Sequence, residues 1–79
     1  MQLIIHFTPA DYATWKADFD GDMEGRMNAG LTLMQLWREV DGTGATALFE
    51  ANDRRKAEAW LDNQRRTGTS LDARFLKTA

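Results

Sequence analysis

The sequence contains no cysteine, one histidine and one proline among its 79 residues. The absence of cysteine excludes disulfide bonds and thiolate metal ligands, and one histidine cannot form a histidine-rich metal site, so we expect no metal. A chain of this length forms one domain, residues 1–79, which buries only about 60% of its unfolded surface. A core this thin, without disulfides or metal ions, favours stabilisation by a second copy of the chain.

Long apolar runs and an excess of basic charge are also missing. No segment approaches the roughly 20 apolar residues of a transmembrane helix, and residues 1–9 lack the basic start and long apolar core of a signal peptide. We therefore expect a cytoplasmic protein without membrane contacts. Ten basic and twelve acidic residues give a net charge of -2. Proteins that bind nucleic acid usually carry a basic stripe, so we expect no nucleic-acid partner.

The first structural pattern is a strand at Gln2–Phe7, where β-branched and aromatic side chains predict a buried position in a sheet. Because successive side chains of a strand point to opposite faces, Ile4 and His6 share one face. The other face holds Leu3, Ile5 and Phe7.

A helix is predicted to follow. Thr8 suits the N-cap and Pro9 the first helical position, and Gly30 is a natural stop. Gly21 and Gly25 indicate a bend or a close approach inside this helix. Residues three and four positions apart form its apolar stripe: Tyr12, Trp15, Phe19, Met23 and Met27.

Residues 31–51 are predicted to form a β-hairpin around Asp41–Gly44, where two glycines allow a tight turn. A four-residue loop pairs Val40 with Ala45 and Leu36 with Phe49, and paired residues share a face. One face then holds Met34, Leu36, Ala47 and Phe49. The other holds Leu33, Gln35, Trp37, Thr46, Leu48 and Glu50. A loop one residue longer or shorter would reverse this assignment.

A second helix and a last strand complete the pattern. Asn52 or Asp53 caps the helix and Gly68 ends it, while Asp72–Thr78 alternates like a strand. The inward face of the helix holds Ala57, Trp60, Leu61 and Gln64. The order strand, helix, strand, strand, helix, strand predicts a ferredoxin-like α+β fold, with two helices on one face of a four-stranded antiparallel sheet.

The second face of this sheet has no further chain to cover it. Large exposed apolar patches usually mark an interaction site, and the simplest cover is the same face of a second subunit in a two-fold homodimer. The residues expected in that dimer interface are Leu33, Gln35, Trp37 and Leu48.

The chain resembles the dimeric α/β-barrel superfamily over nearly its whole length. The motifs that carry this resemblance are Asp11-Tyr12, Trp15-Lys16 and Phe19-Asp20 on the first helix, Ala29-Gly30-Leu31 before the second strand, and Phe49-Glu50 before the cap at Asn52-Asp53. The resemblance implies a protomer that pairs sheet to sheet into a barrel, with a pocket between its sheet and helices. Similar proteins include cofactor-free antibiotic-biosynthesis-type monooxygenases, haem-degrading enzymes, lactone isomerases and stress-induced barrels. Their haem ligand is typically a histidine on a helix, whereas His6 lies on a predicted strand, so we expect no cofactor.

His6 is the one side chain that titrates near neutrality, and it is a candidate general base. Such a base needs an orienting partner, and Glu50 on the adjacent strand is the candidate. The alternative is a structural histidine that is hydrogen-bonded to Glu50 or Gln35.

Aromatic residues and methionine suggest a pocket for a small flat molecule. The candidate ligand-binding residues are Trp15, Met34, Phe49 and Trp60, each of which could equally be ordinary core. Three hypotheses follow for function. The first is a cofactor-free, monooxygenase-like enzyme acting on a small aromatic compound. The second is a non-catalytic ligand-binding or accessory barrel protein, and a third is an interaction module without a pocket.

Overall fold

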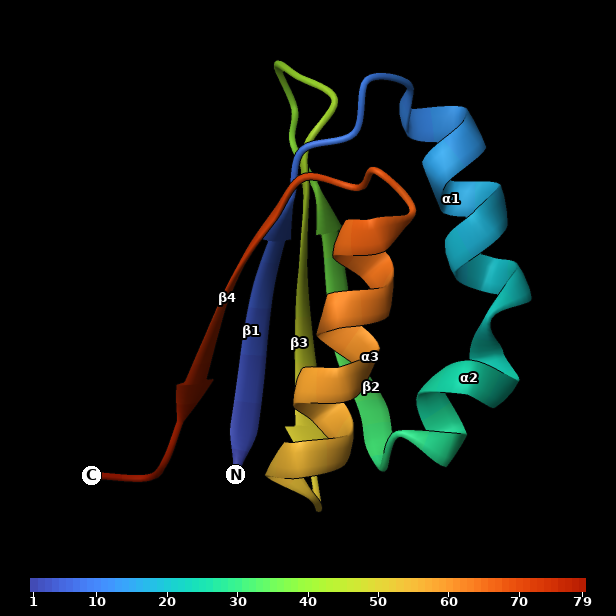
Figure 1. Cartoon of the computed structure of the whole chain (residues 1–79). Helices are drawn as coiled ribbons and strands as arrows, with labels where there is room; N and C mark the ends of the chain where they lie inside the picture. The colour runs from blue at the N-terminus through green and yellow to red at the C-terminus, as the bar shows by residue number, and fades with distance from the viewer.

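A four-stranded antiparallel sheet of order β2-β3-β1-β4 organises the protein, and three helices lie on one of its faces (Figure 1). The computed structural model describes all 79 residues. The strands are β1 (Gln2–Phe7), β2 (Leu31–Arg38), β3 (Ala45–Ala51) and β4 (Leu71–Leu76). The helices are α1 (Tyr12–Gly21), α2 (Met23–Asn28) and α3 (Arg54–Arg66). The predicted ferredoxin-like fold is confirmed, with the first helix divided in two. No helix has the length and apolar character needed to cross a membrane.

The core lies between the sheet and the helices. Alternate residues of β1 and β3 supply its floor, because every second side chain of a strand points to the same face. The fully buried members are Leu3, Ile5, Phe7, Ala45, Ala47 and Phe49. Three small alanines on β3 let the helices approach the sheet closely, and aromatic residues from α1 and α3 fill the space above them.

The chain enters α1 later than the sequence predicts. The predicted N-cap Thr8 instead continues the sheet, since its backbone N–H donates to Ser70 at 2.9 Å. The carbonyl of Pro9 accepts a hydrogen bond from the Thr43 hydroxyl at 2.7 Å, which ties this crossing segment to the hairpin loop. Asp11 is the true N-cap, and its carboxylate accepts from the backbone N–H of Thr14 at 3.1 Å.

The predicted long helix breaks after Gly21, and the break changes which residues face the core. Trp15 and Phe19 on α1 are buried as expected, but Met23 and Met27 on α2 are 63% and 69% exposed. That part of the predicted apolar stripe is wrong, because α2 starts again with a new rotation around its axis. Arg26 is the residue that α2 buries in their place.

Gly30 ends α2 as predicted, with a positive φ of 72° that favours glycine. A Cβ there would also collide with Oδ1 of Asn52. Asp53, one of the two predicted caps, is the N-cap of α3, and Gly68 with a φ of 88° follows its C-terminus.

The hairpin is present, but its register differs from the predicted one. Leu36 pairs with Ala47 and Arg38 with Ala45, so the loop is six residues long, and the N–H of Glu39 donates to Gly44 at 2.9 Å. The loop is two residues longer than predicted. Because this difference is even, the paired residues next to the loop still point to their predicted faces of the sheet.

A β-bulge between Leu33 and Gln35 then reverses the faces for the first part of β2. Leu33 lies opposite Phe49, on the helix side, so its predicted place on the uncovered face is wrong. Met34 is the extra residue of the bulge and is 62% exposed. Its predicted place in the core beside Phe49 is therefore also wrong.

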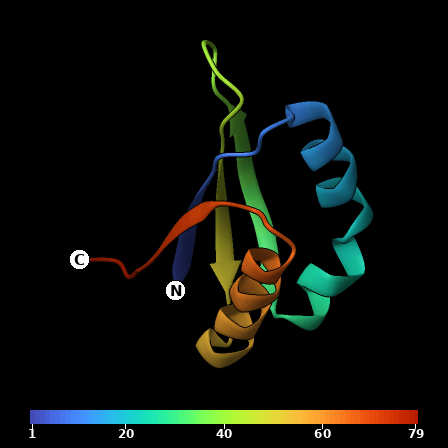
Figure 2. The same cartoon turned by 45° about the horizontal axis from the view of Figure 1, so that its top comes forward.

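The face of the sheet that no helix covers, here called the open face, carries mixed side chains. The strand registers place twelve residues on it: Gln2, Ile4, His6, Thr32, Gln35, Trp37, Thr46, Leu48, Glu50, Asp72, Arg74 and Leu76. Only four of them are apolar. Figure 2, with the top of the molecule turned forward, shows the hairpin loop projecting beyond the sheet and α1 standing apart from α3.

Candidate functional site

A cleft of about 910 Å³ separates α1 and α2 from α3. Its upper part runs from the entry of α1 to the turn after α3, and its lower part lies between α2 and the first turns of α3. Pocket volumes of a few hundred to about 1,000 Å³ are typical of small-molecule sites. This cleft, here called the interhelical cleft, is therefore a candidate binding site.

Aromatic side chains form its wall beside the core. Trp15 and Phe19 stack in a tilted arrangement with ring centroids 5.0 Å apart, and both line the cleft. Trp60 lines it from α3 and packs edge-on against Phe49 at 6.0 Å. Because these rings contact one another and the sheet, they are held in place before any ligand arrives.

One hydrogen bond joins the two walls. The indole Nε1–H of Trp60 on α3 donates to Oδ2 of Asp22 at 3.0 Å, and Asp22 lies at the junction of α1 and α2. Gly25 leaves room for this carboxylate, since a Cβ at that position would collide with it. The break between α1 and α2 therefore positions Asp22 to hold the lower end of the cleft together.

Arg26 is a charged side chain in the core, and only 6% of it is exposed. Its guanidinium donates to the carbonyl oxygen of Phe19, in the last turn of α1, and stacks 4.1 Å from the centre of the Phe19 ring. Burial lowers the pKa of Arg26, while Asp22 and Asp20 oppose that shift. It thus caps α1 together with the backbone N–H of Asp22, which donates to the same Phe19 oxygen at 3.2 Å.

Polar side chains also line the cleft. Asp18, Asn63 and Gln64 line it, with Lys56 at its lower end. The carboxylate of Asp11 is already engaged, because it accepts from the Thr14 hydroxyl at 2.5 Å and from its N–H, and these bonds lower the pKa of Asp11. Asp18 and Lys56 make no ion pair within the protein. They are the two charges of the cleft that remain free for a ligand.

His6 lies on the open face, across the sheet from the cleft. Its Nδ1 is 3.1 Å from the hydroxyl of Thr46, and its Nε2 is 3.7 Å from Oε1 of Glu39. These two residues and Asp72 surround it, because Thr46 and Asp72 are its partners on β3 and β4.

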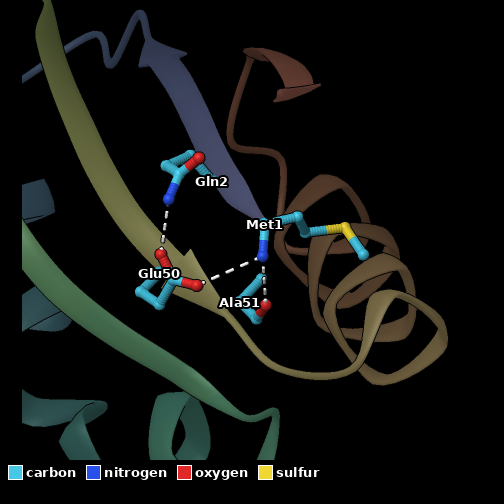
Figure 3. A network of polar contacts seen from close by, with 4 residues as sticks. All are labelled: Met1, Gln2, Glu50 and Ala51. Atoms are coloured by element: carbon cyan, nitrogen blue, oxygen red, sulfur yellow. Dashed lines mark hydrogen bonds and ion pairs between the residues drawn. The ribbon is translucent and has the colours of Figure 1, made fainter. Parts of the chain in front are cut away.

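Glu50 lies at the other end of β3 and does not reach His6. Its carboxylate accepts hydrogen bonds from the amino group of Met1 at 3.1 Å and from Nε2 of Gln2 at 2.7 Å (Figure 3). The hydrogen bond from the Met1 amine, followed by that from Gln2, lowers the pKa of Glu50. The predicted His6–Glu50 pair is therefore wrong, since four residues of strand, about 13 Å, separate the two positions.

The predicted ligand-binding residues likewise do not all lie at one site. Trp15 and Trp60 meet at the interhelical cleft, whereas Phe49 is fully buried beneath them and Met34 lies on an edge strand. Of the predicted interface residues, Gln35, Trp37 and Leu48 lie on the open face. No three histidine, aspartate or glutamate side chains gather in a way that would hold a metal ion.

Sequence reasoning missed Asp22, Arg26 and Asp18 because they fall outside any apolar stripe. Asp22 carried one usable signal, since an aspartate between Gly21 and Gly25 suits a broken helix with a new N-terminus. Thr46 and Glu39 depend on the hairpin register, which the sequence predicted incorrectly.

Comparison with known proteins agrees with the fold and leaves the activity open. A solved crystal structure, of an uncharacterized NIPSNAP domain protein from Burkholderia xenovorans, superposes with a TM-score of 0.61 at 12% sequence identity, covering 100% of this chain and 95% of that one. No curated protein matches the sequence. A family model described as a domain of unknown function, DUF3303, matches residues 1–67. On this match, which spans most of its length, the chain belongs to the DUF3303 family.

Proposed function

We propose that the protein binds a small organic molecule in the interhelical cleft and performs no chemistry on it there. The observation that carries this proposal is the cleft itself, with about 910 Å³ of space beside preorganised tryptophan rings. An apolar wall with a few polar groups at fixed positions is the usual composition of a small-molecule site.

The position of His6 favours binding over the oxygenase hypothesis. A general base must come within hydrogen-bond reach of the substrate proton, and His6 lies on the opposite face of the sheet from Trp15 and Trp60. None of the cleft-lining residues is a histidine, cysteine or tyrosine. A cofactor-free oxygenase reaction in this cleft would therefore lack a base of neutral pKa.

The free charges of the cleft suggest the class of ligand. Asp18 can accept a hydrogen bond from an ammonium group, and Trp15 and Trp60 offer aromatic surface to a flat ring. Asn63 and Gln64 can hydrogen-bond neutral polar groups of the same molecule. An aromatic amine satisfies these groups together.

The proposal is tested with three compounds that share an indole ring: tryptamine, tryptophol and indoleacetate. Each is titrated to millimolar concentration while the indole N–H signals of the three tryptophans are followed by NMR. We expect tryptamine to bind best and to shift the signals of Trp15 and Trp60. Trp37 on the open face serves as the internal control. Shifts confined to Trp37, or no shift with any compound, would contradict the proposal.

A charge variant sharpens this experiment. Asp18→Asn should remove the preference for tryptamine over tryptophol, because it removes the free carboxylate of the cleft. Glu24→Gln is the matched control, since Glu24 is exposed on α2 and does not line the cleft. Equal effects of the two variants would show that general electrostatics, and not Asp18, attracts the amine.

We also propose that two protomers pair through their open faces, as the resemblance to dimeric α/β barrels implies. The apolar residues of that face support this, since Trp37 is 49% and Leu76 is 46% exposed, and Ile4 and Leu48 lie between them. A two-fold axis would place each patch against its own copy. Trp37→Glu should shift sedimentation toward the monomer, whereas Met23→Glu, on exposed α2, should not. A wild-type chain that sediments as a monomer at micromolar concentration contradicts the dimer.

A further inference from the structure

The open face contains a second hollow, which is separate from the interhelical cleft and is accessible in the free protomer, whereas the proposed pairing of open faces would cover it. It measures about 240 Å³ and is lined by Ile4, His6, Thr46, Asp72 and Arg74. Three strands contribute to it, and four of its five side chains are polar. A hollow of this size has room for a short acyl group.

We propose that Thr46, His6 and Glu39 form a hydroxyl–imidazole–carboxylate relay that transfers short acyl groups from esters to water. A nucleophile, a base within hydrogen-bond reach of it, and a third group that orients the base are the elements of such a site. The Thr46 hydroxyl lies 3.1 Å from Nδ1 of His6, and Oε1 of Glu39 lies 3.7 Å from Nε2. Both nitrogens of the imidazole therefore face the groups that the relay requires.

The hairpin loop supplies the orienting carboxylate. Glu39 folds back over the loop, and Gly44 makes this possible because a Cβ at Gly44 would collide with the Glu39 carboxylate. In the tautomer with hydrogen on Nε2, the Nδ1 lone pair is free to accept from Thr46, while the Glu39 carboxylate lies 3.7 Å from Nε2, beyond direct hydrogen-bond distance but close enough to attract the imidazolium. This tautomer is the one that can remove the hydroxyl proton.

Charged groups on β4 complete the hollow. Arg74 is the one permanently positive side chain lining it, and a guanidinium can stabilise the negative oxygen that forms when a carbonyl is attacked. Asp72, the β4 partner of His6, adds a negative charge to the same hollow. The charges around His6 are thus Glu39 from the loop, with Asp72 and Arg74 from β4.

The reaction is a two-step hydrolysis. The Thr46 oxygen bonds to the acyl carbon while its proton passes to Nδ1 of His6. The ester C–O bond breaks, and the leaving alcohol takes that proton. A water molecule then attacks the acyl-threonine and gives a proton to Nδ1. The bond between Thr46 and the acyl group breaks, the proton returns to the Thr46 oxygen, and a carboxylic acid is released.

The test substrate is p-nitrophenyl acetate, whose hydrolysis releases a coloured product, and the rate is measured at protein concentrations at which the chain sediments as a free protomer. We expect Thr46→Val, which keeps His6, to reduce the rate at least tenfold below wild type, and His6→Ala to reduce it at least as far. Glu39→Gln and Gly44→Ala should each reduce it severalfold, since the first removes the orienting carboxylate and the second displaces it. Thr46→Ser should retain the activity.

Mass spectrometry of the protein quenched during turnover should find one acetyl group on Thr46. A Thr46→Val variant as fast as wild type would overturn the proposal, because it would leave only the attack of a surface imidazole. Acetylation of His6 or lysine without acetyl-Thr46 would overturn it as well. Tryptamine binding and sedimentation are measured on the same variants, so that a failure of the relay is distinguished from a failure of the cleft or of the dimer.

Discussion

The two faces of the sheet come from the same strands and differ in almost every physical respect. On the helix side, β3 presents small and aromatic side chains that are fully buried, and Arg26 is the one charged residue buried in the core. On the open face the intervening residues of the same strands are mostly polar and partly exposed. Since period-two alternation separates the two sets, stability and surface chemistry can change independently at neighbouring positions.

Alanine substitutions of Phe49 and Leu48 should show the largest difference between the two faces in the free energy of unfolding. Phe49→Ala removes a fully buried ring and should cost about 3–5 kcal/mol in the free energy of unfolding. Leu48→Ala, on the open face, should cost about 1 kcal/mol because less area is buried. Denaturant unfolding at the lowest measurable protein concentration, which removes any dimer contribution, checks both values. Equal costs there would contradict the comparison.

Two arginines offer the next test. Arg26→Met keeps the apolar stem but removes the charged donor to the Phe19 carbonyl and leaves only the Asp22 N–H, which should cost about 1–3 kcal/mol. Arg74→Met on the open face is the matched control and should change stability by less than about 0.5 kcal/mol. Thermal and urea unfolding of both variants measure these two changes in stability. A negligible loss for Arg26→Met would mean that the Asp22 N–H alone satisfies the Phe19 carbonyl.

Two tryptophans extend the comparison to a single hydrogen bond. Trp60→Phe removes the Nε1–H that Asp22 accepts, and should cost about 1–2 kcal/mol while weakening the junction of the cleft walls. Trp37→Phe loses no hydrogen bond within the chain and should change monomer stability by under about 0.5 kcal/mol. Urea unfolding followed by circular dichroism measures the two costs. Identical effects would remove any structural role from the Trp60–Asp22 bond.

The smallest expected effect concerns acid sensitivity on the open face. The folded pKa of Glu50 lies below its ordinary value, so the ionised carboxylate stabilises the fold above the unfolded pKa of about 4.3. That contribution is lost as the pH falls through the folded pKa. Gln2→Ala removes one donor and should raise the pKa of Glu50 in an NMR titration. The Glu24 carboxyl is the control in the same titration, and an unchanged Glu50 pKa would disprove the role of Gln2.

The sequence was sufficient to predict the elements of this fold. The bounds of β1, the stop at Gly30 and the cap at Asp53 follow from local rules and agree with the structure. The tryptophans of the cleft were also found, because Trp15 and Trp60 lie on helical stripes that must pack against the sheet.

The errors in the predicted structure arose where one inserted or missing residue turns the side chains that follow it to another face of the strand or helix. The bulge at Met34 was missed, although the spacing of three between Leu33 and Leu36 interrupts the alternation and was a usable signal. The break after Gly21 likewise changed which residues of α2 face the core. The contacts of His6 join side chains from three separate segments of the chain, and local sequence patterns do not determine such contacts.

The strand order has a consequence for the path by which this chain folds. The first strand of the sequence occupies the middle of the sheet, between β3 and the last strand, β4. The hairpin of β2 and β3 is local and can form quickly, whereas β1 must pair with β3 and β4 across long stretches of sequence, and β4 is the last of the strands to be synthesised. During synthesis the early apolar strand therefore waits for residues that emerge much later, which makes it the segment most in need of protection from aggregation.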